Sequence, residues 1–250
     1  KKYQNPKVYN VYSQEIDPKN MMPTTANQLP APDQKVDLPV VRESSSIPKG
    51  GTETTWQYPS PQMFWNALVR KGKTEGVSEQ DVVNVVRIHN NMNENTWLKV
   101  LQWEQLHPPP KEVEGAEPKL LRFLGRPDEL SPKAKFKMLL GNPAPFDRHD
   151  WIVDRGGKEV RYIIDYYHDE ANADADKTPL SMRDNTSIKS IKVDVRPALD
   201  SPTAIFDRVV NMPLRRLLNE TDYRPLPLLP PSETVIAEKR KKMQLEKAFL

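Results

Sequence analysis

The sequence of 250 residues contains no cysteine. This absence excludes disulfide bonds, cysteine nucleophiles, and zinc or iron–sulfur sites with cysteine ligands. No apolar run approaches the roughly 18 residues of a membrane span, so we expect any membrane contact to be peripheral. The net charge is only +3, from 37 Lys and Arg against 34 Asp and Glu, which argues against a nucleic-acid partner.

The common signatures of catalysis are also missing. The sequence has no Gly-rich phosphate loop, no nucleophile elbow, no His-Glu-x-x-His pair and no zinc-ligand cluster. What remains is four histidines and an aromatic content of five Trp, eight Tyr and six Phe. A histidine surrounded by aromatic residues is therefore the candidate for a functional site.

Proline, by contrast, is abundant and divides the chain. It makes up 25 of the 250 residues, about twice the usual ~5%. Residues 1–55 are rich in Pro, Asn, Gln, Ser and Thr and are predicted to form an extended or disordered arm. Residues 56–220 are predicted to form one domain. Residues 221–250 are predicted to form a Pro-rich linker and a basic C-terminal helix, either a solvated tail or a segment that docks a partner or an anionic membrane.

Helix and strand signals inside the domain indicate an α+β fold, with several helices packed on a small antiparallel sheet. A serine followed by a proline is a favoured helix start. The glycines of Arg155-Gly156-Gly157-Lys158 favour a tight hairpin between two strands, and a polar loop precedes a third strand. The predicted helices span 61–72, 78–106, 132–141 and 202–219, with a capping box at Ser78 and Asp81 and a kink at Pro213, and the predicted strands span 151–154, 160–166 and 191–196.

His89 interrupts the long, mostly apolar helix. Asn93 and Trp97 follow it by four and eight residues, so all three lie toward one side of the helix. A neutral imidazole facing an aromatic pocket is suited to hold one axial site of heme iron. An inert, hydrogen-bonded core histidine is the alternative.

Several continuous segments of the sequence resemble those of a known family. They are 58–67 (YPSPQMFWNA), Arg87-Ile88-His89-Asn90, Asn93-Glu94, 145–151 (PFDRHDW), 159–167 (EVRYIIDYY) and 194–201 (DVRPALDS). The region from Trp56 to about Arg208 resembles the cytochrome c heme lyases, also called holocytochrome c synthases. The Cys-Pro motifs that often occur near the N-terminus of this family are absent here.

The resemblance implies a lyase of the mitochondrial intermembrane space, bound peripherally to the inner membrane. It implies that heme b is the substrate and that its vinyl groups are joined by thioether bonds to the Cys-x-x-Cys-His motif of apocytochrome c. The substrate then supplies the thiols that this chain lacks. By the same resemblance His89 stands at the iron ligand, the substrate His supplies the second axial ligand, and Trp56 contacts heme.

Other residues near these segments have weaker assignments. Glu94 is predicted to have a structural or supporting role, and Asn90 and Asn93 either anchor the imidazole or the substrate peptide or cap local polar groups. His149, flanked by carboxylates, favours a salt-bridged turn over a ligand. Arg87 is a candidate for a heme propionate, with an ordinary ion pair as the alternative.

Two other functions stay open at this point. One is a heme carrier or sensor that forms no covalent bond, and the other is a scaffold with an inert histidine. The sequence does not distinguish soluble cytochrome c from the c-type subunit of the respiratory bc complex as acceptor.

Overall fold

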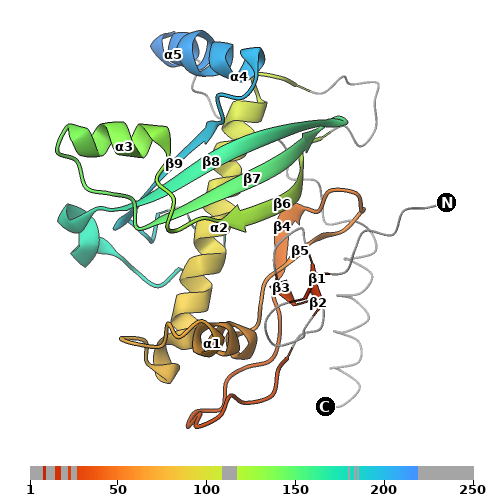
Figure 1. Ribbon diagram of the computed structural model, residues 1–250, viewed down its shortest axis with the longest axis vertical. Helices are drawn as coiled ribbons and strands as arrows, with labels where there is room; N and C mark the ends of the chain where they lie inside the picture. The colour runs from red at the N-terminus through yellow and green to blue at the C-terminus, as the bar shows by residue number, and fades with distance from the viewer. Residues whose placement is uncertain are drawn as a thin grey trace.

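A four-stranded antiparallel sheet forms the centre of the protein, with a long helix across one face (Figure 1). The computed structural model describes residues 8–9, 15–17, 22–23, 27–108, 117–179, 181–182, 184 and 186–218. The sheet has the order β6-β7-β8-β9. Its strands are β6 (Lys119–Gly125), β7 (Asp147–Arg155), β8 (Lys158–His168) and β9 (Ile191–Pro197).

The helices are distributed around this sheet. Helix α2 crosses one face and α1 lies below its N-terminal end, while α3 lies over the opposite face of the sheet and α4 and α5 lie at the far end (Figure 1). The bounds are α1 Pro61–Arg70, α2 Val82–Glu104, α3 Pro132–Leu139, α4 Pro202–Phe206 and α5 Met212–Leu217. Two small antiparallel sheets complete the fold: β1 (Val8–Tyr9), β2 (Glu15–Asp17) and β3 (Met22–Pro23), and β4 (Ser44–Pro48) with β5 (Thr55–Gln57). The α+β class predicted from the sequence is confirmed.

Local sequence signals explain most of these elements. The hydroxyls of Ser60, Ser131 and Ser201 accept hydrogen bonds from the third backbone N–H of α1, α3 and α4, as the Ser-Pro starts predicted. The β7–β8 turn is built by Gly156 and Gly157, with φ of 56° and 89°, which is the left-handed conformation that a two-residue hairpin needs. The predicted hairpin is confirmed.

Two helix predictions were wrong in their bounds. Ser78 caps a 3₁₀ turn at Glu79–Asp81, and α2 begins only at Val82, so Asp81 does not complete a capping box. The helix predicted over 202–219 is divided into α4, a π turn at Asp207–Asn211 and α5. Pro213 lacks an N–H for the preceding turn, which accounts for the break in the regular hydrogen bonding there.

Strand β6 was not predicted. Its pairing with β7 shifts register between Leu120 and Arg122. The extra residue in this bulge puts Leu120, Leu121 and Phe123 out of strict alternation, and so removes the period of two by which strands are recognised.

Part of the predicted arm packs on the domain. Leu38 and Ile47 are 7% and 3% exposed and belong to the two apolar cores. Strand β4 pairs with β5 and contacts α2. The region of 27–55 is therefore extended but folded against α2, while the predicted linker and basic helix of 221–250 lie outside the described residues.

The main core lies between α2 and the sheet. Trp97 and Val100 of α2 pack with Trp151, Tyr162 and Ile164 of the hairpin, and all five are 3% exposed or less. The smaller core joins α1, the start of α2 and the arm through Leu38, Trp65, Val82 and Val86. The opposite face of the sheet is ionic, with buried Asp150 and Asp165 paired to arginines.

Candidate functional site

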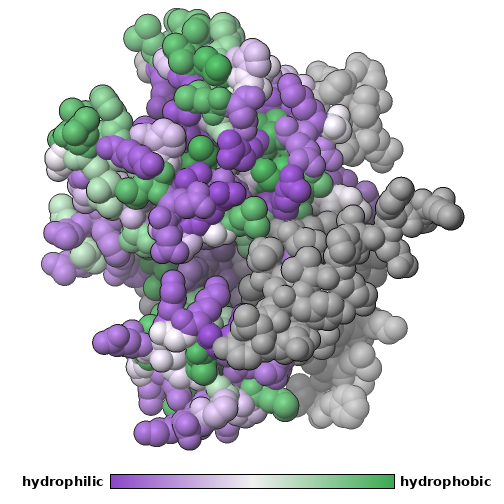
Figure 2. Space-filling model, in the orientation of Figure 1, coloured by the Kyte–Doolittle hydropathy of each residue, from purple (hydrophilic) through white to green (hydrophobic). Residues whose placement is uncertain are grey.

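His89 lies on α2 where the helix leaves the sheet and meets α1. The space-filling view shows the surface hollowed between the part built on the sheet and the part built on α1 (Figure 2). The imidazole is exposed to water, and its ring lies 5.3 Å from the ring of Phe64 between centroids, tilted by 54°. Protein nevertheless surrounds the ring closely enough that burial lowers the pKa of His89, with His149 lowering it further and Asp147 raising it. The imidazole is thus both accessible and neutral near pH 7.

Two residues of the sheet, Asp147 and His149, carry charges that act on His89. Asp147 and His149 are two residues apart on β7, so their side chains leave the same face of the strand. The Nε2 atom of His149 lies 3.0 Å from Oδ2 of Asp147. The His149 ring also meets the Tyr166 ring edge to face at 5.4 Å. We call the space bordered by Phe64, His89, Asp147 and His149 the His89 hollow.

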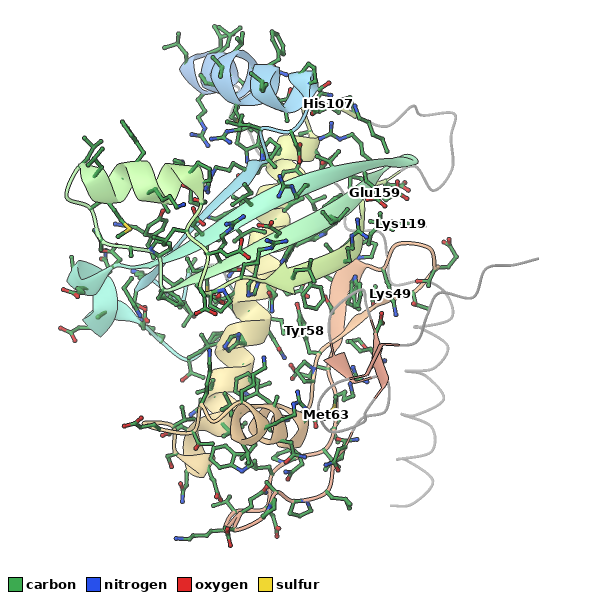
Figure 3. The ribbon with its side chains drawn as sticks, in the orientation of Figure 1. Lys49, Tyr58, Met63, His107, Lys119 and Glu159 are labelled. Carbon is green, nitrogen blue, oxygen red and sulfur yellow. The ribbon has the colours of Figure 1, made fainter. Side chains whose placement is uncertain are left out.

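Glu94 fixes the arm to α2 one turn beyond His89. The carboxylate is 2% exposed, and its Oε1 accepts hydrogen bonds from Ser45 Oγ (2.6 Å), Ser46 N (3.0 Å) and Tyr58 Oη (2.9 Å). The Ser46 hydroxyl donates to Oε2. Burial and the Glu94 charge raise the pKa of Tyr58, so this phenol stays protonated. Tyr58 stands beside α2 between the sheet and α1 (Figure 3).

The neighbouring asparagines hold two further segments. Asn90, 2% exposed, donates from Nδ2 to Glu43 Oε2 at 2.9 Å and so adds a second tie to the arm. Asn91 is fully buried and donates from Nδ2 to the carbonyl of Asp184 at 2.6 Å. The polar cluster that interrupts the apolar pattern of α2 therefore binds chain segments on two sides of the helix.

The other predicted site residues are dispersed. Trp97 is 3% exposed and packs in the main core, Asn93 is half-buried, and Arg87 is exposed. The side shared by His89 and Trp97 turns by about 80° over eight residues, enough to carry Trp97 from the hollow into the core.

Trp56 occupies a defined position in β5. Its Nε1 donates to the Leu120 carbonyl at 3.0 Å, its ring meets Phe123 edge to face at 5.3 Å, and Lys49 Nζ lies 4.9 Å from its ring centroid. These contacts place Trp56 against the edge strand β6. Among the described residues, no ring contact joins Trp56 to His89.

Sequence reasoning missed Phe64 and Asp147 as partners of His89. The crossing of α1 and α2 brings Phe64 to the imidazole, and no pattern within α1 indicates this contact. The spacing of Asp147 and His149 on one strand was a usable signal, because alternate residues share a face.

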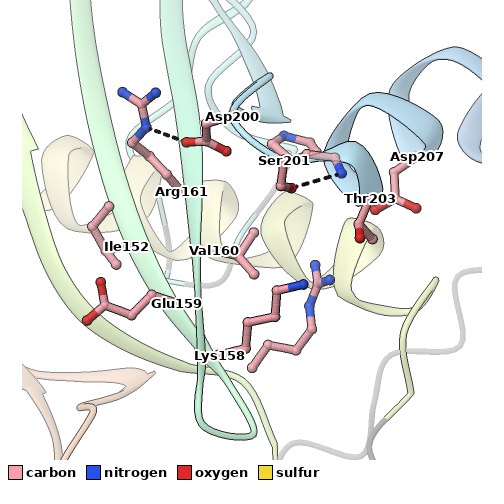
Figure 4. A pocket seen from close by; sticks show the side chains of 12 residues that line it. Ile152, Lys158, Glu159, Val160, Arg161, Asp200, Ser201, Thr203 and Asp207 are labelled. Atoms are coloured by element: carbon pink, nitrogen blue, oxygen red, sulfur yellow. Dashed lines mark hydrogen bonds and ion pairs between the residues drawn. The ribbon is translucent and has the colours of Figure 1, made fainter.

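A separate cavity lies at the other end of the sheet (Figure 4). Its volume is about 400 Å³, and it opens between the β7–β8 hairpin and α4. Arg161, Asp200 and Asp207 line it, but Arg161 pairs with Asp200 and Asp207 pairs with His107. Among the residues that the structure describes, no group of three or more His, Asp and Glu side chains is arranged to hold a bare metal ion, and no helix is long and apolar enough to cross a bilayer.

Comparison with known proteins identifies close relatives. The profile of the family described as cytochrome c/c1 heme lyase matches residues 1–212. The holocytochrome c-type synthases of Bos taurus and Homo sapiens are each 47% identical over 204 residues, which cover 78% of this chain and 66% and 68% of theirs. The holocytochrome-c synthase of Saccharomyces cerevisiae is 41% identical over 227 residues, covering 79% of this chain and 78% of its own. The chain thus spans about two thirds of the length of the mammalian relatives. No solved structure matches.

Proposed function

The chain belongs to the cytochrome c/c1 heme lyase family, and we propose that it attaches heme to apocytochrome c. Heme b is the substrate, and its vinyl groups form thioether bonds with the cysteines of a Cys-x-x-Cys-His segment. The observation that carries the proposal is an imidazole, His89, that is exposed to water, kept neutral by its surroundings and in contact with the Phe64 ring.

A neutral imidazole is the form that coordinates iron, and an aromatic ring beside it offers a flat apolar surface to a porphyrin. In this proposal His89 takes one axial position and the His of the substrate motif takes the other. The ties of Glu94 and Asn90 to the arm hold this part of α2 in place. The free energy of such fixed orientation can lower a barrier by several kcal/mol, up to ~7–11 in favourable cases.

Thioether formation requires no nucleophile from the protein, because the substrate brings the thiols. The chain contains no cysteine that would compete for the vinyl groups. The role of the protein in the reaction is to bind heme, to orient the substrate segment and to allow each of the two thiols to lose its proton.

Heme titration of purified wild type and His89→Ala tests the site. We expect a Soret band in wild type that is much weaker in His89→Ala. His168→Ala is the matched control, because that imidazole is exposed and its ring contact is with Phe146 rather than with Phe64. Equal spectra for wild type and His89→Ala would refute ligation by His89.

Covalency separates a lyase from a heme carrier. The chain is co-expressed with a Cys-x-x-Cys-His polypeptide, and the product is extracted with acid and acetone. We expect heme to stay on the polypeptide with wild type and to be absent with His89→Ala. Heme that binds the chain but is always extracted would identify a carrier or sensor instead.

We also propose that the protein docks on the intermembrane-space face of the mitochondrial inner membrane through α3 and the α4–α5 region. Apolar side chains gather over both elements (Figure 2). Phe136 and Leu139 of α3 are 62% and 82% exposed, and Val209 and Leu217 are 67% and 78% exposed. The only acidic side chain of 132–140 and 202–218 is Asp207, which is buried. Apolar side chains among lysines and arginines suit the interface of an anionic bilayer.

Vesicle flotation tests this surface. We expect wild type to bind vesicles that contain phosphatidylserine and to bind pure phosphatidylcholine less. The double variant Leu139→Ser/Leu217→Ser should lose most of the binding. Leu29→Ser is the matched control, since Leu29 is 73% exposed but lies outside both elements. Equal binding by the double variant and the control would exclude this surface.

A further inference from the structure

Helix α1 packs against the N-terminal part of α2 (Figure 1), and a lysine lies at the end of the face that it turns toward α2. Phe64 and Leu68 of this face pack against the smaller core, and the Phe64 ring contacts the His89 ring at 5.3 Å. Lys71 follows Leu68 by three residues and Phe64 by seven, so it continues the same row. The backbone N–H of Lys71 still donates to the Ala67 carbonyl at 3.1 Å, so the helical geometry extends to this residue.

The position of Lys71 relative to His89 suits the shape of heme. The iron lies at the centre of the macrocycle and both propionates extend from one edge, so a cation that binds a propionate lies to the side of the iron ligand. Lys71 is two helical turns beyond Phe64, or about 10 Å along α1 at ~1.5 Å per residue. A porphyrin on His89 with its ring along α1 therefore brings one edge toward Lys71.

The amine of Lys71 has no ion pair or hydrogen bond in the described part of the chain. Burial lowers its pKa, the charges of Arg70 and Lys73 lower it further, and that of Asp147 raises it. Both oxygens of Asp147 are engaged elsewhere: Oδ1 accepts the backbone N–H of the next residue at 2.8 Å, and Oδ2 lies 3.0 Å from Nε2 of His149. The ammonium group thus lies beside like charges without an anion of its own, and an anionic ligand would offset this repulsion.

The arginines are less well placed for a propionate. Arg87 precedes His89 by two residues, which puts it about 160° round α2 from the imidazole that contacts α1. Arg148 and Arg196 of the sheet are buried and paired with buried aspartates. Lys71 is instead exposed and lies on the face of α1 that contacts His89.

We propose that Lys71 binds a propionate of the heme that His89 coordinates, and that it thereby sets which edge of the porphyrin meets the substrate thiols. The proposal rests on the heme lyase function. Propionates and vinyl groups occupy opposite edges of heme, so a propionate bound to Lys71 directs the vinyl groups away from the C-terminal end of α1. A lysine that only interacts with the dipole of its helix is the alternative.

Lys73 provides a matched control. Gly72 has a φ of 61°, the left-handed conformation that turns the backbone out of a helix. Lys73 therefore does not continue the row of Phe64 and Lys71, although it is exposed and carries the same charge. Replacing Lys73 changes the net charge as much as replacing Lys71 does, but leaves the proposed contact in place.

Soret titrations with two ligands test the proposal. Heme and heme dimethyl ester, in which both propionates are uncharged, are titrated into wild type, Lys71→Gln and Lys73→Gln in the same detergent. We expect Lys71→Gln to bind heme about 5- to 10-fold more weakly than wild type, as for the loss of an ion pair in a partly enclosed site, and Lys73→Gln to stay within about 2-fold. All three proteins should bind the ester equally within about 2-fold, since it offers no carboxylate.

Equal heme affinities in wild type and Lys71→Gln would overturn the proposal. So would a loss in Lys71→Gln that is as large for the ester as for heme, because a structural effect does not depend on the carboxylate. Equal losses in Lys71→Gln and Lys73→Gln would show a diffuse effect of charge and would also overturn it. Thermal midpoints check folding, and Lys71→Met, which keeps the aliphatic part of the side chain, gives the same comparison if Lys71→Gln does not fold.

The same titrations separate the two levels of inference. A wild type that gives no Soret band with heme overturns the proposed function and the role of Lys71 together. A wild type that binds heme, with no difference between heme and its ester that depends on Lys71, overturns the role of Lys71 alone.

Discussion

Helix α2 contains two buried glutamates, ten residues apart, whose carboxylates accept hydrogen bonds from different kinds of donor. Glu94 accepts only from neutral donors, namely two serines, a tyrosine and a backbone N–H. Glu104 accepts from Arg155 Nε and Nη2 at 2.6 and 2.9 Å and from Tyr162 Oη at 2.5 Å. Both carboxylates are 2% exposed.

The difference follows from what each glutamate joins. Glu104 is bonded in the fork geometry of a guanidinium and ties α2 to the hairpin, within the folded core. Glu94 ties α2 to the arm five residues beyond His89, about 140° round the helix from it. Its donors are all neutral, so this tie adds no cationic side chain to the N-terminal half of the helix. The N-terminal half of the helix therefore binds the arm and carries the proposed ligand site, whereas the C-terminal half is bound to the hairpin.

The largest effect is expected from Glu104→Ala. The change leaves the Arg155 charge and the Tyr162 hydroxyl buried without their partner, so the free energy of unfolding should fall by about 3–5 kcal/mol. Urea unfolding measures it. Heme affinity of the folded fraction should be unchanged, and Glu104→Gln, which keeps an acceptor for Tyr162, should lose less. If Glu104→Ala lost as much heme affinity as Glu94→Ala, the proposed difference in role between the C-terminal and N-terminal halves of α2 would be wrong.

Glu94→Ala should have a smaller effect on stability and a larger one on heme. Ser45 and Tyr58 lose their buried acceptor, so we expect a loss of about 2–3 kcal/mol in urea unfolding. The arm is released five residues beyond His89, so the Soret titration should show weaker heme binding. Ser46→Ala, which removes one half-buried donor, is the matched milder variant. Unchanged heme affinity in Glu94→Ala would limit this residue to a structural tie.

The two tryptophans at the predicted site offer a finer comparison. Trp56→Phe removes the hydrogen bond from Nε1 to the Leu120 carbonyl and should cost about 1 kcal/mol in urea unfolding. If Trp56 contacts heme, as the family resemblance implies, its replacement should also weaken the Soret titration. Trp97→Phe is the control from the main core and should leave heme affinity unchanged. Equal heme affinities in both variants would remove Trp56 from the site.

The smallest effect concerns the charge state of His89. Burial and His149 lower its pKa, so the folded state binds fewer protons than the unfolded state. The resulting stability is present above the unfolded pKa of ~6.5 and is lost as pH falls through the lower folded value. Imidazole resonances of the heme-free protein should place the midpoint of His89 below 6.5, and Asp147→Asn should lower it further. A midpoint at or above 6.5 would contradict a neutral, ligand-ready ring.

Local patterns predicted much of this fold because they act over a few residues. The Ser-Pro helix starts at Ser60, Ser131 and Ser201 and the Gly156-Gly157 hairpin depend on backbone geometry that neighbouring residues supply. Strand β6 was missed because its bulge disturbs the alternation. The packed half of the arm was missed because its apolar residues, such as Leu38 and Ile47, are few and lie in a polar, Pro-rich segment.

The sequence by itself determined the Ser-Pro helix starts, the hairpin and the α+β class, since each of these rests on short-range chemistry. It also supplied the prediction that His89 is the iron ligand, which rests on the resemblance between long sequence segments. Only the tertiary structure decided which residues share the His89 hollow. Phe64, His89 and the Asp147–His149 pair come from three elements separated by dozens of residues, and the packing of α1 and α2 against the sheet brings them together. No pattern within one segment predicts that these residues come together, because their proximity depends on the packing free energy of the whole fold.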